Sequence, residues 1–317
     1  MPKTKTNVFR NDFFDMESQT FEYSYDKQGN LTADYNKGIT SITYNHLNLP
    51  EHIVINNEMS GNNGEIYYTY DATGRKLAKK SIGNSGSGST LNELRNYIAG
   101  FEYTAGSTTP ETYQTEEGRI IFENDGTVGG IKLTHEYHLK DHLGNTRLSF
   151  TVEGKHITST TTTDYYPFGA VIQKPNATPL NPAENHYLYN HKELQQDFGL
   201  QWYDYGFRFY DAILGRFYTQ DRFAEKYVNM SGYQYAANNP MNFIDVNGDS
   251  LKVSGAEEDI LKFQEMINNG LNGFYTAKNT DGNISLEKTD KDISTMNEQQ
   301  KNFYGALQSV IGDDNLV

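Results

Sequence analysis

The densest group of side chains able to ligate a metal ion is His135-Glu136-Tyr137-His138, followed by Asp141 and His142. On a strand, side chains alternate between the two faces, so His135 and His138 would point to opposite sides. A shared metal site is therefore not expected. We interpret these residues as polar groups of a strand and its turn.

Two short phrases have the look of calcium-binding loops, Asp281-Gly282-Asn283 and Asp245-Val246-Asn247-Gly248. Neither is followed by a bidentate Glu at the spacing of such loops, so both are interpreted as turns. The chain also lacks a glycine-rich phosphate loop and a nucleophile elbow. The sequence thus predicts neither a cofactor nor a metal.

Residues 202–221, WYDYGFRFYDAILGRFYTQD, are rich in aromatic residues with charged residues between them. Tyr203, Tyr205, Phe207 and Phe209 recur with a period of two, which predicts a single strand with one buried face. The other residues singled out in or near this stretch are Arg208, Asp211, Gly215, Arg216 and Asp221.

The 317-residue chain is acidic, with 27 Lys and Arg against 41 Asp and Glu and a formal net charge of −14. This balance argues against nucleic acid or an anionic membrane as a general partner. The 24 Tyr, 17 Phe and 28 Gly suit many short strands and turns. No stretch approaches the ~20 apolar residues of a membrane span, no signal peptide is visible, and without Cys the redox compartment is undefined.

A short phrase recurs along the first half of the chain. Tyr23-Ser24-Tyr25-Asp26 leads to Gly29, and Tyr68-Thr69-Tyr70-Asp71 leads to Gly74, with weaker echoes at Tyr44 to Pro50 and Tyr137 to Leu148. Tyr-x-Tyr places two rings on one face of a strand. Asp-x-x-Gly forms a turn, because the Asp side chain bonds the backbone ahead and Gly adopts positive φ. The repetition predicts a long meandering antiparallel sheet.

These phrases resemble the YD-repeat family, also called RHS repeats. The resemblance implies a mainly β fold in which the repeats wind into a cage-like shell, here a partial one. We assign residues 1–163 to this shell segment. Within it, SIGNSGSGST (81–90) is interpreted as a flexible loop, and residues 104–130 as a pair of hairpins with Gly turns.

Residues 164–250, which we call the aromatic block, resemble the RHS repeat-associated core domain over about 85 residues. The resemblance rests on Tyr165-Tyr166-Pro167-Phe168-Gly169, Leu214-Gly215-Arg216-Phe217 and Asn238-Asn239-Pro240, among other phrases. It implies that the block caps the shell and precedes a variable C-terminal payload. Arg208 and Arg216 are then expected to pair with acids or carbonyls, and Asp211 and Gly215 to be structural.

In many relatives this core cleaves itself with acidic residues. The resemblance places the first acid at Asp221 and another at Asp245, and two carboxylates sharing a proton can act on a water as acid and base. The sequence departs from the pattern at Arg222, Val246 and Asp249, around the expected acid and the scissile bond. We therefore expect Asp221 and Asp245 to be structural, with autoproteolysis as the alternative.

Residues 251–317, which we call the tail, are expected to form a small α+β domain. The pattern predicts a helix over 256–270, a hairpin around Asp281-Gly282 over 274–288, and a second amphipathic helix over 296–312. The start of the tail is similar to the region before metallopeptidase toxins of related chains. No His follows His191, so the tail does not supply a zinc-protease site.

The sequence thus predicts a scaffold that encloses or presents a C-terminal effector in bacterial competition or surface interaction. The expected partners are the chain's own payload or further shell segments, with an immunity protein and glycans as others. The alternatives are a self-cleaving core and a carbohydrate-binding surface protein, since exposed Tyr rings can stack on sugars. The family resemblance implies a secreted or cell-surface location.

Overall fold

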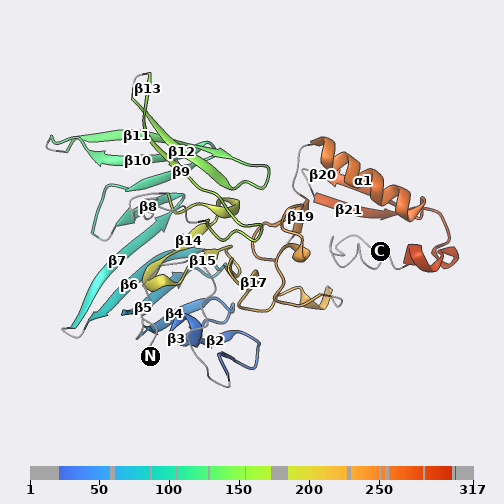
Figure 1. The fold of residues 1–317 in the computed structure, drawn as a ribbon, viewed down its shortest axis with the longest axis horizontal. Helices are drawn as coiled ribbons and strands as arrows, with labels where there is room; N and C mark the ends of the chain where they lie inside the picture. Colours follow the sequence, from blue (N-terminus) through green and yellow to red (C-terminus); the bar gives the residue numbers. More distant parts are fainter. Residues whose placement is uncertain are drawn as a thin grey trace, which may run out of the picture.

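The computed structural model describes residues 21–304 apart from 58–60, 86–87, 105, 128, 154, 173–184, 227–229, 250, 254–256, 281–282 and 302–303. The mainly β prediction is confirmed. One large sheet lies on the left in Figure 1, and the aromatic block and the tail lie on its right. No helix within the described ranges is long and apolar enough to cross a membrane.

The large sheet, which we call the wall sheet, has 13 strands in the order in which they follow along the chain, and every pairing between them is antiparallel. It is open, with β1 and β13 at its two edges. Its strands are β1 (Tyr23–Tyr25), β2 (Leu31–Asp34), β3 (Ile39–Tyr44), β4 (Pro50–Asn57), β5 (Asn62–Tyr70), β6 (Lys76–Ser85), β7 (Gly88–Ile98), β8 (Phe101–Thr104), β9 (Thr112–Thr115), β10 (Gly118–Asn124), β11 (Ile131–Lys140), β12 (Thr146–Glu153) and β13 (His156–Thr162).

The repeated turns form as their residue types predict. Asp26 accepts hydrogen bonds from the backbone N–H groups of Gln28 and Asn30, at 2.9 and 2.8 Å, and Gly29 has φ +83°. The turns at Asp71 and Asp141 repeat this pattern, and Asn45 takes the place of Asp in a fourth. Each side chain closes a tight connection between neighbouring strands, which keeps the meander in register.

The interpretation of residues 81–90 as a flexible loop is wrong. Residues 81–85 belong to β6 and 88–90 to β7, and Asn84 pairs with Ser89 across a long hairpin. Ser and Gly have low strand propensity, but backbone pairing with a neighbouring strand overrides that preference. The hairpin pair expected over 104–130 is present as β9, β10 and the start of β11.

The aromatic block packs onto one face of the wall sheet, which we call the inner face. Leu200, Trp202, Phe209 and Tyr218 join a buried cluster with apolar residues of β2–β5. The wall residues of this cluster are Leu31, Ile39, Ile42, Ile53, Ile55, Ile66 and Tyr68. The block therefore supplies four of the eleven buried residues of the core on which this part of the wall sheet rests.

The prediction of one strand through residues 203–209 is wrong. Two short strands, β15 (Trp202–Asp204) and β16 (Phe209–Asp211), pair antiparallel across a turn. With β14 (Glu193–Gln195) and β17 (Arg216–Phe217) they form a four-stranded sheet. Trp202 and Tyr203 are neighbours on β15 and both are 1% exposed, so this small sheet is buried on both faces and shows no solvent-facing alternation.

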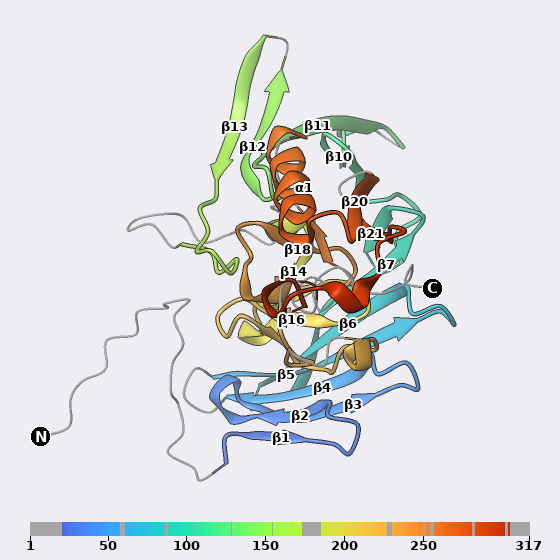
Figure 2. The ribbon, with the colours of Figure 1, turned by 90° about the vertical axis from the view of Figure 1, so that its right-hand side faces the viewer.

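The block ends in β18 (Phe243–Asp245), which pairs with β19 (Leu251–Val253) of the tail. The helix predicted over 256–270 is α1 (Glu257–Leu271), and the predicted hairpin is β20 (Tyr275–Thr280) with β21 (Asn283–Lys288). Most of the second predicted helix, 296–312, lies outside the described residues. Figure 2 looks onto α1 and the block from the side away from most of the wall sheet.

Short 3-10 helices complete the described structure. They are Tyr35–Lys37, Tyr189–His191, Asp197–Gly199, Ala224–Lys226, Ala236–Asn238 and Ile293–Thr295. The tail shares a buried cluster with the block, to which Ile267, Leu271, Phe274 and Leu286 contribute from one side and Tyr203, Tyr210, Phe217 and Tyr235 from the other. The tail is therefore held against the block by apolar packing.

Candidate functional site

The aromatic block contains a buried cluster in which one cation, Arg208, binds two acids, Asp221 and Asp245. Arg208 follows the turn between β15 and β16, and only 3% of its surface is exposed. Its Nη2 donates to Asp221 Oδ2 at 2.8 Å and to Asp245 Oδ2 at 3.3 Å. The other guanidinium nitrogens donate to the carbonyl oxygens of Gly232 and Gly248. One side chain thus joins three segments of the block.

Aromatic rings cover this cluster. The Arg208 guanidinium carbon lies 3.7 Å from the centroid of the Phe217 ring, and that of Arg222 lies 3.8 Å from the Phe207 ring. Arg222 also forms an ion pair with Asp249. Guanidinium groups stack on rings while their N–H donors remain free to bind acids in the plane. The cluster is therefore a layered arrangement of rings, cations and carboxylates.

The remaining carboxylate oxygens bind backbone N–H groups. Asp221 Oδ1 accepts from Phe223 at 2.8 Å, and Asp245 Oδ1 accepts from Gly248 and Asp249 at 2.6 and 3.0 Å. Burial raises the pKa of Asp221 above its ordinary value, and attraction to Arg208 opposes that rise. Burial also lowers the pKa of Arg208, which the acids oppose. The two acids named from the sequence do lie together, with a cation between them.

Asp211 is at the centre of a second buried site, which faces the wall sheet. Its carboxylate pairs with Lys37 Nζ at 3.1 Å and accepts from the Tyr218 hydroxyl. It also accepts from the backbone N–H groups of Ile213 and Leu214 at 2.8 and 3.1 Å. Because Lys37 lies between β2 and β3, this acid ties the block to the wall.

Gly215 and Arg216 occupy the turn and strand that follow. Gly215 has φ +67°, and a Cβ there would lie 3.0 Å from the Phe168 ring. Arg216 donates to the Tyr25 hydroxyl at 2.8 Å and lies over the Tyr23 ring. The contacts of Arg216 therefore differ from the acid or carbonyl partner that was expected, and they reach the edge strand β1.

A buried ionic network, which the sequence patterns do not predict, joins β6 to the block. Lys76 Nζ lies 2.6 Å from both Glu193 Oε2 and Asp204 Oδ2. Lys79 Nζ lies 3.0 Å from Asp197 and 2.6 Å from Glu93. Glu193 also accepts from the Tyr97 hydroxyl at 2.8 Å, and despite its burial the cations hold the pKa of its carboxyl well below the usual range.

The sequence does carry one sign of this network: charged residues such as Lys79 occupy strand positions that face inward. Lys79 lies opposite Tyr68 in the β5–β6 register, and the Tyr68 ring is part of the buried cluster. A cation on the same face as buried rings needs acidic partners from elsewhere in the chain. The pattern does not say which acids of the block these are, because Glu193 and Asp197 lie more than 100 residues away from Lys76 and Lys79.

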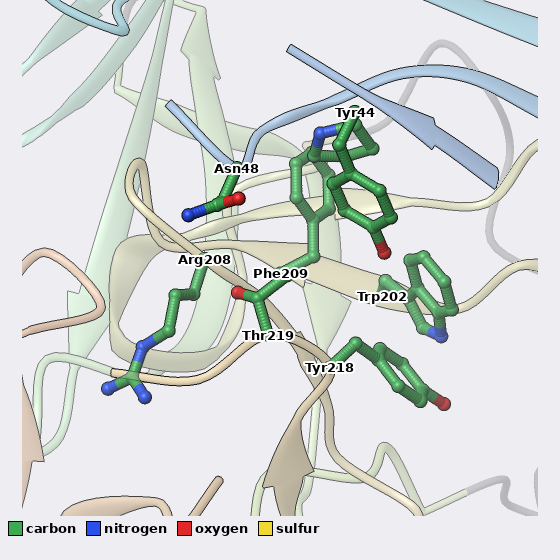
Figure 3. Close-up of a pocket in the computed structure, with 8 residues that line it drawn as sticks. Tyr44, Asn48, Trp202, Arg208, Phe209, Tyr218 and Thr219 are labelled. Carbon is green, nitrogen blue, oxygen red and sulfur yellow. The ribbon is translucent and has the colours of Figure 1, made fainter. Parts of the chain in front are cut away.

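A small cavity lies where the block meets β3 and β4 (Figure 3). It measures about 10 Å³ and is lined by Tyr44, Asn48, Pro50, Trp202, Arg208, Phe209, Tyr218 and Thr219. Figure 3 shows that the guanidinium of Arg208 points away from the Trp202 and Tyr218 rings. A space of this size holds about one water molecule, so it offers no room for a substrate or cofactor.

His135, His138 and His142 do not come together in one site. His138 is buried on the inner face of β11, where its Nε2 lies 2.8 Å from Glu136 Oε1, whereas His135 is on the opposite face. The hydrogen bond from His138 and the charge of Arg119 lower the pKa of Glu136 against the effect of its burial. His142 is near the carbonyl oxygen of Met241. Across the part of the chain that the structure describes, no three His, Asp or Glu side chains form a metal-binding group.

The structure describes one of the two phrases that are similar to calcium-binding loops, and only the flanks of the other. Asp245 closes a turn through its hydrogen bonds to the N–H groups of Gly248 and Asp249, as interpreted from the sequence. Asp281 and Gly282 lie outside the described residues, although Thr280 and Asn283 on either side pair in the β20–β21 register.

Comparison with known proteins gives a fold likeness and one sequence relative. No protein-family model matches the chain. It is 29% identical over 231 residues to salivary gland surface protein 1 of Aedes aegypti, a match that covers 71% of this chain and 6% of that protein. The chain therefore spans only a small part of this relative.

Solved structures of toxin complexes share the fold. The crystal structure of TcdB2-TccC3-Cdc42 matches with a TM-score of 0.53 and 18% identity, over 71% of this chain and 11% of that one. The Photorhabdus luminescens Tc holotoxin pore with mutated TccC3 matches with a TM-score of 0.52 and 19% identity, over 71% and 10% of the two chains. These likenesses support an RHS-like fold for the described chain.

Proposed function

We propose that this chain is a wall-and-cap segment of an encapsulating scaffold of the RHS type. Residues 1–163 form a piece of the wall, residues 164–250 cover its inner face, and residues 251–317 are the polypeptide that the scaffold presents. The observation that carries this proposal is the shared core, in which Trp202, Phe209 and Tyr218 of the block complete the apolar face of β2–β5. The likeness to the TcdB2-TccC3 structures supports it at the level of fold.

The proposed partners are the chain's own C-terminal polypeptide and further wall strands. Both edges of the wall sheet, β1 and β13, are open within the described part of the chain, and an open edge accepts another strand. We place the assembled scaffold outside the producing cell or on its surface, in bacterial competition or surface interaction.

The presenting role is tested by limited proteolysis of the purified chain. The scaffold should hold the tail on the block, so a tail fragment should appear only when the whole chain unfolds. Phe274→Asp puts a charge into the shared cluster, where Phe274 is 7% exposed, and should release the tail early while the wall stays resistant. Leu261→Asp is the control, because Leu261 is 53% exposed on α1.

Early release of the tail from the unaltered chain, at the rate seen for Phe274→Asp, would refute the presenting role. The expected result is at least a tenfold slower release from the unaltered chain, because Phe274 contributes about 1.5–3 kcal/mol of apolar burial to the docked state.

A second candidate function is self-cleavage by the block. It is favoured by the meeting of Asp221 and Asp245 at one guanidinium, beside Gly248 and Asp249. One carboxylate would take a proton from the attacking water while the other protonates the leaving amine. Against it, the two acids share the Arg208 cation, which stabilises both as carboxylates and disfavours a shared proton.

Intact mass separates the two functions. The scaffold proposal expects a single 36.0 kDa species after prolonged incubation. Self-cleavage expects a fragment that begins near residues 249–252, whose formation stops in Asp221→Asn and continues in Asp125→Asn, a substitution in an exposed turn.

A further inference from the structure

The two faces of the wall sheet reverse their character between its first and second halves. On the inner face, β2–β5 present the apolar cluster that the block covers. From β6 onward the inner face carries charged residues that are buried, including Lys79, Arg95, Glu102, Arg119 and His138. The pairing register connects them strand by strand, since residues opposite each other in a sheet share a face.

These inward charges are paired. Arg95 forms ion pairs with Glu93 and Glu102, and Arg119 Nε lies 2.9 Å from Glu136 Oε1. The inner face of the second half is therefore a layer of paired charges. Because strands alternate, Ile98, Leu133 and Leu139 lie on the outer face, whereas Ile121 shares the inner face with Arg119.

The outer face of this half, which we call the outer apolar face, is exposed. Its side chains with the most exposed surface lie on β7, β11, β12 and β13 and are between 40% and 62% exposed. They are Leu91, Ile98, Ile131, Leu133, Leu139, Val152 and Ile157. Aromatic rings lie between them. The ring centroids of Tyr137 and Phe150 are 5.5 Å apart in a stacked arrangement, and those of Phe101 and Tyr113 are 4.3 Å apart.

Formal charge on this face is limited to its first strand, where Lys80 of β6 points outward opposite Leu94. Within the described strands β8–β12, the residues that the register places outward include no Asp, Glu, Lys or Arg, and His135 is the one titratable imidazole there. The whole chain carries a net charge of −14. Two copies would repel each other at most surfaces, and this is the face on which they meet without opposing like charges.

The outer apolar face extends over several neighbouring strands. A monomeric protein rarely exposes an apolar patch above roughly 300–600 Å². The exposed aliphatic side chains and the half-buried rings extend over strands β7–β13. A stable pairwise interface buries ~800 Å² per partner, so we expect it to draw on all of these strands.

We propose that the outer apolar face binds the same face of a second copy of this chain, so that two wall sheets pack face to face. The interface is isologous, and each copy supplies the apolar partner that the other lacks. Packed sheets lie about 10 Å apart with their side chains interdigitated, which suits Leu, Ile and aromatic rings and excludes water from both. The ionic inner faces stay on the far sides.

Sedimentation velocity of the full chain from about 1 to 100 µM tests the proposal. We expect a species of twice the 36.0 kDa chain mass to form as the concentration rises. Leu133→Asp and Leu139→Asp should each raise the dimer dissociation constant at least ~100-fold, because each places a charge in the buried interface. Leu261→Asp should leave it within ~2-fold. Leu261 is the matched control for Leu133, since both are 53% exposed.

A second measurement follows burial directly. The chain has no Cys, so Leu139→Cys introduces one thiol whose reaction with a bulky maleimide reports its exposure. Its reaction rate should fall at least tenfold as dimer forms, while that of Leu261→Cys stays constant. A chain that remains a monomer throughout, or a dimer that Leu133→Asp and Leu139→Asp leave intact, would overturn the proposal. Equal weakening by Leu261→Asp would also overturn it.

Discussion

Lys76 Nζ lies 2.6 Å from Glu193 Oε2, although the two residues are separated by 117 positions in the chain. The same ammonium lies 2.6 Å from Asp204 Oδ2, and its side chain is 10% exposed. The contact joins β6 of the wall sheet to the aromatic block. Burial opposes the charge of this Lys, but the two acids raise its pKa above the ordinary value and keep it a cation.

Lys76→Met should destabilise the chain by about 3–5 kcal/mol, because it leaves two carboxylates buried without their cation. Chemical denaturation followed by tyrosine and tryptophan fluorescence measures this. Lys278→Met is the matched control, since Lys278 pairs with Glu287 at an exposed position and should cost less than about 1 kcal/mol. Equal losses in the two variants would show that the buried network contributes nothing specific.

Local turn chemistry could be predicted from the sequence. Asp26 and Asp71 each bond the backbone two and four residues ahead, as their Asp-x-x-Gly phrases indicate. The phrase contains both partners of each bond, so no distant residue is needed. The meander follows from the repetition of such turns, since each returns the chain beside the strand it has left.

The site was predictable only in part. Asp221 and Asp245 were named through a family resemblance, and the structure brings them to Arg208. The fold of residues 202–211 was not predictable from its period of two, because Trp202 is buried against the wall and Tyr203 against the rest of the block. The block partners of Lys76 and Lys79 lie in a segment that the pattern of β6 does not specify.

Asp34 should make stability fall as the pH rises from about 4 to about 6. Its burial raises the pKa to about 6 from an ordinary value of 3.8, against the charge of Lys37. A raised pKa stabilises the fold at low pH, and this contribution is lost as the pH rises through the folded value. Asp34→Asn keeps an oxygen for the N–H groups of Asn36 and Lys37 and removes the titration.

The free energy of unfolding of the unaltered chain minus that of Asp34→Asn should therefore fall by up to about 3 kcal/mol between pH 4 and 6.5. Urea denaturation at steps of pH gives this difference. A difference that is flat, or that rises with pH, contradicts the assignment to Asp34.

His191 should act in the opposite direction over nearly the same pH range. Burial lowers its pKa to about 4 from 6.5, helped by the nearby charge of Lys140. A lowered His pKa stabilises the fold above about pH 6.5, and the contribution is lost as the pH falls through 4. His191 has φ +58°, which Asn tolerates, so His191→Asn removes the titration without new backbone strain.

The unaltered chain should lose up to about 3 kcal/mol relative to His191→Asn as the pH falls from 6.5 to 4. Because Asp34 and His191 oppose each other, the unaltered chain should change less with pH than either variant. Denaturation of the three proteins in parallel checks this. A variant curve that runs parallel to that of the unaltered chain would contradict the role given to the replaced residue.

Gly215→Ala should be more damaging than Gly144→Ala. Both glycines have positive φ, of +67° and +78°, so either Ala incurs about 1–2 kcal/mol of left-handed strain. A Cβ at Gly215 would also lie 3.0 Å from the Phe168 ring, whereas one at Gly144 meets nothing within 4 Å. We expect Gly215→Ala to cost about 1 kcal/mol more, measured as the difference in free energy of unfolding. Equal costs would mean that the ring moves freely.

The central claim is that the wall sheet and the aromatic block form one cooperative unit, and Trp202→Ala tests it. Trp202 is 1% exposed and packs between β2–β5 and the rest of the block. Hydrogen exchange by mass spectrometry should show protection in β4 and in β15–β16 falling together, by about 3–5 kcal/mol in both. If exchange accelerates in β15–β16 alone while β4 keeps its full protection, the block does not complete the wall and the scaffold proposal is contradicted.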